Sequence, residues 1–195
     1  MHYCERCADP TVMAPEGDEA VCPVCGERRP ARRLPAFVVT GASAAGKTTV
    51  LPHLVAELPE CVVFDVDWLI GPFRRACSFG EVDWPAFRDA WLAVAHGAAQ
   101  GGRSAVLLGP FVPAQLADLP ALRWQSAVHF AVLDCADEVR RARLEARPAW
   151  RERDVDSHLA FAAHLRSTLS PVLRTDGPTP EATARSLAAW VRGLL

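Results

Sequence analysis

The residues best suited to chemistry form a short loop motif in the first quarter of the chain. Residues 41–48 read G-A-S-A-A-G-K-T, which matches the pattern G-x-x-x-x-G-K-[ST], and the largely apolar residues 37–40 precede them. A buried strand that runs through such a loop into a helix presents successive backbone N–H groups to an anion. Lys47 is then expected to reach the β- and γ-phosphates of ATP, and the Thr48 hydroxyl to hold Mg²⁺.

The nucleotide contacts expected from this motif involve both the loop and the start of the helix. The residues are Gly41, Ser43, Ala44, Ala45, Gly46, Lys47, Thr48 and Thr49. The alternative is a glycine-rich turn with an exposed lysine. The preceding strand, both glycines, the lysine and the threonine together disfavour that alternative.

Four of the seven cysteines form two C-x-x-C pairs near the N-terminus. Fourteen residues separate the pair Cys4 and Cys7 from the pair Cys22 and Cys25. Two such knuckles can place four thiolates around one Zn²⁺, and the segment resembles a zinc ribbon. The alternative is a set of redox-active or disulfide-bonded thiols, which the doubled spacing and a reducing cytosol disfavour. We expect a structural zinc that supplies much of the folding energy, on the order of 10 kcal/mol.

Two aspartates follow the second apolar run of the main part of the chain. Asp65 and Asp67 come at the end of residues 61–65, which read as a buried strand. Ligands of open parallel sheets bind at the carboxyl ends of the strands, so one carboxylate is expected to accept a proton from a substrate hydroxyl or to help hold Mg²⁺ through water. The alternative is that one of the two aspartates only caps the next turn.

An arginine-rich segment follows the fourth expected strand. Arg143 and Arg147 are four residues apart and share one helix face, which Arg140 extends. A row of guanidinium groups can close on a triphosphate and stabilise charge in the transferring phosphoryl group. The alternative is a solvated basic face that pairs with Glu138 and Glu145.

The acceptor of a phosphoryl group would meet the segments that follow the second and third strands. Trp68 is expected to stack on a base or sugar, and Arg74 and Arg75 to bind an anionic group, unless the two arginines simply lie in a solvated loop. Arg88 completes the residues expected to bind the substrate.

Strands and helices alternate along the main part of the chain. Strands are expected at residues 37–40, 61–65, 104–109, 127–133 and 172–175, and helices at 48–58, 84–100, 136–146, 155–169 and 180–195. This alternation predicts an α/β fold with a doubly wound, five-stranded parallel sheet. We therefore expect a zinc ribbon at residues 1–30, a linker at 31–35 and a nucleotide-binding domain at 36–195.

Together these features resemble the small P-loop kinases, a superfamily that includes nucleoside, nucleotide, shikimate, gluconate, adenylylsulfate and chloramphenicol kinases. The resemblance covers about residues 36–195 and implies ATP, Mg²⁺ and an alcohol acceptor. It implies that Asp67, or failing it Asp65, is the catalytic base. It also implies that Arg143 and Arg147 are lid arginines beside the catalytic Lys47. Residues 173–177 resemble the segment near the adenine in these enzymes, whereas the zinc ribbon departs from their common pattern.

The composition limits the partners that the chain is expected to have. The formal net charge is -2 and no large basic block is present, which makes a nucleic-acid partner unlikely. No apolar run approaches the length of a membrane span and no secretory signal is visible, so we expect a cytoplasmic protein. The preferred function is an ATP-dependent small-molecule kinase with a nucleoside, nucleotide or antibiotic-like acceptor. The alternatives are a polynucleotide 5′-hydroxyl kinase and a nucleotide-dependent binding module with slow ATPase activity.

Overall fold

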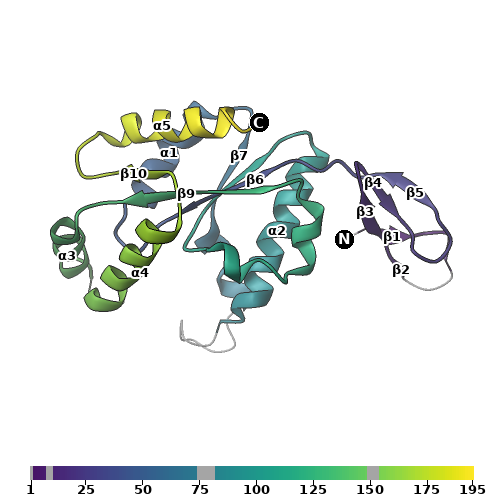
Figure 1. Ribbon diagram of the computed structural model, residues 1–195, viewed down its shortest axis with the longest axis horizontal. Coiled ribbons are helices and arrows are strands. Elements are labelled where there is room, and N and C mark those ends of the chain that lie inside the picture. The colour runs from purple at the N-terminus through teal and green to yellow at the C-terminus, as the bar shows by residue number, and fades with distance from the viewer. Residues whose placement is uncertain (1, 8–10, 74–81, 149–153) are drawn as a thin grey trace.

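The computed structural model describes residues 2–7, 11–73, 82–148 and 154–195, and its centre is a five-stranded sheet (Figure 1). The strands are β6 (Ala36–Thr40), β7 (Val62–Asp65), β8 (Ala105–Leu108), β9 (Val128–Asp134) and β10 (Val172–Arg174). Their order is β10-β9-β6-β8-β7, and every neighbouring pair is parallel. The expected doubly wound parallel sheet is therefore confirmed.

Helices cover both faces of the sheet (Figure 1). The helices are α1 (Lys47–Glu57), α2 (Trp84–Gln100), α3 (Asp137–Glu145), α4 (Val155–Thr168) and α5 (Pro180–Arg192). Short 3-10 turns connect them at η1 (Val66–Leu69), η2 (Gly71–Phe73), η4 (Pro113–Gln115) and η5 (Pro120–Trp124). One core joins the sheet to α1 and α5, and the other joins it to α2 and η5.

The central strands are buried because both of their faces are covered. Every residue of β6 and β8 is buried, which explains why both read as short continuous apolar runs rather than as alternating patterns. Alternate residues of β6 enter different cores: Phe37 and Val39 contact the α1 and α5 side, while Val38 contacts the α2 side.

Local signals set the helix ends close to where the sequence predicts them. The Asp83 side chain accepts a hydrogen bond from the Ala86 N–H at 3.1 Å, and Pro85 occupies the first turn, so α2 begins where expected. Helix α5 ends at Arg192, three residues before the expected end. None of the helices in the described ranges combines the length and the apolarity that crossing a membrane requires.

The cysteine-rich segment forms a small separate layer of short antiparallel strands. They are β1 (Tyr3–Cys4) paired with β2 (Thr11–Val12), and β3 (Ala14–Glu16), β4 (Glu19–Val21) and β5 (Arg28–Pro30) in one sheet. Trp124 of η5 packs into the core of this segment with Met13, Cys4 and Cys22. The segment lies beyond the start of β6, at the opposite end of the main sheet from α3 (Figure 1).

Candidate functional site

The loop between β6 and α1 has the glycine-dependent geometry that its motif predicts. Gly46 has φ 91°, which is a left-handed conformation that favours glycine. A Cβ atom on Gly41 would lie 2.6 Å from the Leu133 carbonyl oxygen of β9, so no larger residue fits there without a shift. The loop is thus held close to the carboxyl end of the neighbouring strand.

A cavity of about 600 Å³ opens over this loop. Three parts of the chain besides the loop and the start of α1 supply its walls: the acidic segment after β7, two arginines in and just after α3, and the segment from Thr175 to Thr183. The lining residues are Ser43, Ala44, Ala45, Gly46, Lys47, Thr48, Thr49, Val50, Asp67, Arg143, Arg147, Thr175, Pro178, Pro180 and Thr183. The fold therefore brings Lys47, Thr48, Asp67, Arg143 and Arg147 to one cavity.

Lys47 lies at the base of this cavity and contacts its own loop. Its Nζ donates hydrogen bonds to the carbonyl oxygens of Gly41 at 2.5 Å and Ala42 at 3.2 Å. Burial lowers the pKa of Lys47 to about 8, and the nearby carboxylates of Asp67 and Asp65 oppose that shift. The ammonium group is thus desolvated, and a bound anion would stabilise its charged form.

The two aspartates after β7 differ in their surroundings. The Asp65 carboxylate accepts a hydrogen bond from the Asp67 N–H at 3.1 Å and caps η1. Asp67 is exposed and lines the cavity. The capping role that the sequence allowed for one of the pair therefore falls to Asp65.

Arg140 and Arg143 of α3, with Arg147 just after it, do not form one row facing the cavity. Arg140 is buried and donates to the Asp134 carboxylate and to the Ser43 carbonyl oxygen, which corrects the expectation that it extends the face of Arg143 and Arg147. Arg143 lines the cavity and donates to the carbonyl oxygens of Ala44 at 3.1 Å and Thr175 at 3.3 Å. These contacts differ from the pairing with Glu138 and Glu145 that was the alternative.

The residues expected to bind an acceptor lie outside this cavity or outside the described residues. Trp68 is 68% exposed on η1, directly after Asp67. The Arg88 guanidinium lies 5.8 Å from the ring centroid of Trp84, and burial lowers its pKa. Among the described residues, Asp65, Trp68 and Arg88 are not in the cavity wall. Arg74 and Arg75 fall outside the described residues.

Sequence reasoning missed part of the cavity wall near the C-terminus. Pro178, Pro180 and Thr183 line the cavity beside Thr175. The resemblance of residues 173–177 to an adenine-proximal segment pointed to Thr175 and stopped just before the prolines. A proline at the start of α5 reads as an ordinary helix signal, so no local pattern distinguishes it as a site residue.

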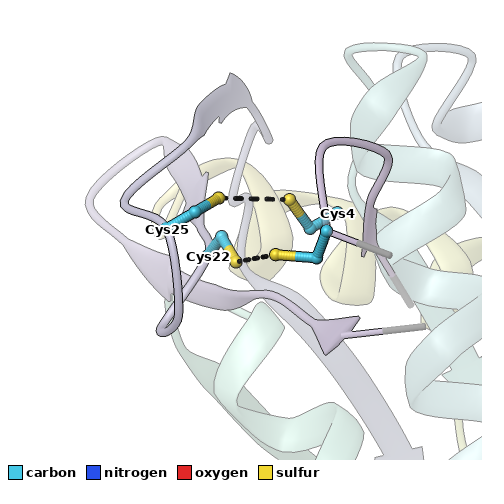
Figure 2. Close-up of side chains that lie close together, drawn as sticks. Cys4, Cys22 and Cys25 are labelled. Carbon is cyan, nitrogen blue, oxygen red and sulfur yellow. Dashed lines mark hydrogen bonds between the residues drawn. The ribbon is translucent and has the colours of Figure 1, made fainter. Parts of the chain in front are cut away.

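The four N-terminal cysteines meet at one point (Figure 2). Their sulfur atoms all lie within 4.8 Å of one another, with Cys4 to Cys25 and Cys7 to Cys22 each at 3.6 Å. Tetrahedral zinc with Zn–S bonds of about 2.3 Å would separate the sulfurs by roughly 3.8 Å. The backbone N–H groups of Cys25 and Val24 lower the pKa of Cys22 to about 6, which favours the thiolate form that binds metal. The cluster is therefore compatible with a small zinc ribbon.

Comparison with known proteins places the fold. The sequence matches no protein-family model and no curated protein. A sugar kinase from Janibacter sp. HTCC2649 is 21% identical, with a TM-score of 0.57 over 84% of this chain and 95% of that chain. The tunicamycin resistance protein of Deinococcus radiodurans is 22% identical, with a TM-score of 0.59 over 82% of this chain and 96% of that chain.

A third solved structure extends the comparison. A gluconokinase from Sinorhizobium meliloti 1021 is 18% identical, with a TM-score of 0.55 over 84% of this chain and 97% of that chain. At these identities the likeness establishes the fold alone. The chain has the fold of these small kinases, as the resemblance to P-loop kinases implies.

Proposed function

We propose that this protein is an ATP- and Mg²⁺-dependent kinase that transfers the γ-phosphoryl group to a hydroxyl of a small molecule. The observation that carries the proposal is the shared cavity. The phosphate-binding loop, an exposed carboxylate and two arginines line it together. The carboxylate in the cavity wall supplies a group that can accept the proton of an acceptor hydroxyl.

The loop and α1 supply the nucleotide contacts in this proposal. The backbone N–H groups of the loop and the Lys47 ammonium hold the β- and γ-phosphates, and the Thr48 hydroxyl holds Mg²⁺. When bound, Mg²⁺ would neutralise charge between the two phosphates. The lining of the cavity by residues 43–50 supports these roles.

Asp67 is the proposed base. It orients the acceptor hydroxyl and takes its proton as the oxygen attacks the γ-phosphorus and the bond to the leaving ADP breaks. The position of Asp67 in the cavity wall and the capping contact of Asp65 support this assignment. Asp65 then positions η1.

Arg143 and Arg147 are the proposed lid arginines that neutralise charge on the transferring group. Both line the cavity, and α3 follows β9 as a lid helix would. Planar guanidinium groups suit this role because they can contact two phosphate oxygens at once.

The proposed acceptor is a nucleoside, a nucleotide or an antibiotic-like molecule. The exposed Trp68 beside Asp67 supports an acceptor with a flat or apolar part that can stack on an indole ring. Solved structures of this fold are named sugar kinase, gluconokinase and tunicamycin resistance protein, which supports a hydroxylated small molecule. Arg88 would bind an anionic group of the acceptor, together with Arg74 and Arg75, which are assigned from the sequence alone.

Two features disfavour a polynucleotide kinase that grips nucleic acid with the cysteine-rich segment. That segment lies at the opposite end of the sheet from α3, far from the loop (Figure 1). The basic side chains there are also paired, Arg28 with Glu16 and Glu19, and Arg29 with Glu5. We propose instead that Cys4, Cys7, Cys22 and Cys25 hold one structural zinc.

An acceptor screen combined with two matched variants tests the kinase proposal. ATP consumption and product mass would be measured with nucleosides, sugars and antibiotics. With the acceptor found, Asp67→Asn should lower turnover by about 10²–10⁴-fold while ATP binding is retained, the usual range for loss of a general base. Asp65→Asn is the matched control, because asparagine caps as well as aspartate does and only the charge is lost. If Asp65→Asn lowers turnover strongly and Asp67→Asn only slightly, the two roles are exchanged. Normal turnover in both variants would refute the proposal.

A further inference from the structure

The carbonyl oxygens of the phosphate-binding loop are held from outside the loop as well as from within it. Lys47 binds the carbonyls of Gly41 and Ala42 from within. Side chains from later parts of the chain bind the next three. The donors are Arg140 to Ser43 at 2.7 Å, Arg143 to Ala44 at 3.1 Å and the Thr175 hydroxyl to Ala45 at 2.9 Å.

These hydrogen bonds from outside the loop have a direct consequence for anion binding. In a trans peptide the C=O and the following N–H point in opposite directions. A donor that fixes the Ser43 carbonyl on the protein side therefore turns the Ala44 N–H toward the other side, where the cavity lies. The same relation links the Ala45 carbonyl to the Gly46 N–H. The donors that hold these carbonyls thus orient the N–H groups that a phosphate needs.

The loop also needs such support because one of its residues is strained. Ala44 has φ 63°, a left-handed conformation that is strained for a residue with a Cβ. Strained residues of this kind persist only where the surroundings fix them. Arg143 holds the carbonyl of Ala44, and Arg140 holds the carbonyl just before it.

Arg140 differs from the other donors because it is completely buried. Arg140 is 0% exposed, and its partner Asp134 at the end of β9 is 1% exposed. One terminal nitrogen of Arg140 donates to the Asp134 carboxylate at 2.5 Å, and the other donates to Ser43. Arg166 and Arg174 also bind Asp134, at 3.1 and 3.4 Å, so the carboxylate is fixed on several sides.

We propose that the Asp134–Arg140 pair is a positioning device for nucleotide binding, and that Arg140 acts from behind the loop rather than as a lid arginine. The proposal rests on the proposed function only in taking the loop as the site for the phosphates of ATP. Asp134 anchors the guanidinium group to the sheet, and the guanidinium group fixes the Ser43–Ala44 peptide with its N–H toward the cavity. Arg140 touches no substrate in this assignment.

A matched pair of variants separates this role from simple stabilisation. Arg140→Met removes the hydrogen bond to the Ser43 carbonyl, whereas Arg166→Met removes another arginine from the same Asp134 carboxylate. The hydrogen bonds of Arg166 go to Asp134 and Asp137 rather than to the loop. The affinity for ATP with Mg²⁺ would be measured by calorimetry, beside thermal unfolding and the backbone amide resonances of residues 42–47.

We expect Arg140→Met to weaken ATP binding by at least about tenfold and to shift the loop amide resonances, since losing one well-placed N–H contact to a charged phosphate costs about that much affinity. Arg166→Met should lower the melting temperature and leave the affinity and the loop resonances unchanged. If Arg140→Met does not fold, Arg140→Lys replaces it, because one ammonium group cannot occupy both positions that two guanidinium nitrogens hold. Wild-type affinity in a folded Arg140 variant would overturn the inference.

Two further measurements distinguish failure of this inference from failure of the proposed function. If the wild-type protein binds ATP and Lys47→Ala does not, the loop is the nucleotide site, and the Arg140 variants then decide the inference alone. If the wild-type protein does not bind ATP with Mg²⁺, the proposed function is wrong and the inference falls with it.

Discussion

Lys47 is the residue whose charge depends most clearly on its surroundings. Its pKa is lowered from 10.5 to about 8, chiefly by burial. Between these two values the unfolded chain binds more protons than the folded protein, so the contribution of Lys47 to stability rises with pH from about 8 to 10.5. The charged form is the one that attracts phosphate, and it is lost as the pH rises through 8 in the nucleotide-free protein.

We therefore expect the affinity for ATP with Mg²⁺ to fall as the pH rises above about 8. Binding at pH 8–9 should be accompanied by proton uptake of up to one proton per site, since the bound phosphates restore the charge on Lys47. Calorimetry in two buffers of different ionisation enthalpy measures this uptake. Lys47→Arg is the control and should show none, because its guanidinium group stays charged at these pH values, whereas equal uptake in that variant would assign the proton to another group.

At the scale of a single element, α3 and the turn that follows it place Arg140, Arg143 and Arg147 in three different surroundings. Arg140 is buried against Asp134, Arg143 lies between the loop and Thr175, and Arg147 is half-buried in the cavity wall. Arg140 and Arg143 lie in α3, whereas Arg147 follows the end of the helix. Position along this segment, rather than residue type, separates support of the loop from the proposed contact with the nucleotide.

We expect different outcomes for conservative substitutions of Arg143 and Arg147, because their contacts differ. Arg147→Lys should lower turnover and leave the melting temperature nearly unchanged, because a lysine cannot contact two phosphate oxygens through a planar fork. Arg143→Lys should lower both, because Arg143 also holds the carbonyls of Ala44 and Thr175. Turnover measurements and thermal unfolding check this, and a lower melting temperature with normal turnover in Arg147→Lys would assign that residue a purely structural role.

At the scale of the whole molecule, the core of the cysteine-rich segment includes a residue of the main part. Trp124 belongs to η5 of the main part, yet it is 2% exposed and packs among the core residues of the segment. The ring of His96 on α2 and the ring of His2 each lie 4.9 Å from the ring of Trp124. The Arg33 side chain also donates to the Gln125 carbonyl oxygen at 2.7 Å. The segment is therefore joined to the main part through packing as well as through the chain.

We therefore expect loss of the metal to lower the stability of the whole protein but not its affinity for nucleotide. The wild-type protein should contain about one zinc per chain, as one four-thiolate site requires. Cys25→Ser should lose the zinc, lower the melting temperature and change the fluorescence of Trp124, because the packing around that ring depends on the segment. The affinity for ATP should remain, since the loop lies at the other end of the sheet (Figure 1).

Elemental analysis, thermal unfolding and comparison with Trp124→Phe check this prediction. Cys61→Ser is the control: Cys61 is buried near the sheet, away from the cluster, so zinc content should stay at about one per chain. Full stability and unchanged fluorescence without metal would show that the segment folds without zinc.

Local patterns in the sequence determined the fold class and the candidate chemistry of this protein. The loop motif, the alternation of apolar runs with helical segments, and the cysteine spacing each depend on residues close together in the chain. A glycine such as Gly46 that must take a positive φ, or a helix cap such as Asp83, is visible within a few residues. The five-stranded parallel sheet and the four-cysteine cluster were therefore predictable.

Only the tertiary structure decided which residues of a matching type share a site. Asp65 and Asp67 are equivalent by sequence, and the course of the chain after β7 turns one into the cap and the other toward the cavity. Arg140 became a partner of Asp134 and Ser43, the latter 97 residues away in the chain, and Trp124 joined a core formed by residues 4–31 of the chain. Such choices depend on which surfaces the packed sheet and helices enclose, because burial and long-range hydrogen bonds exist only after the chain has folded.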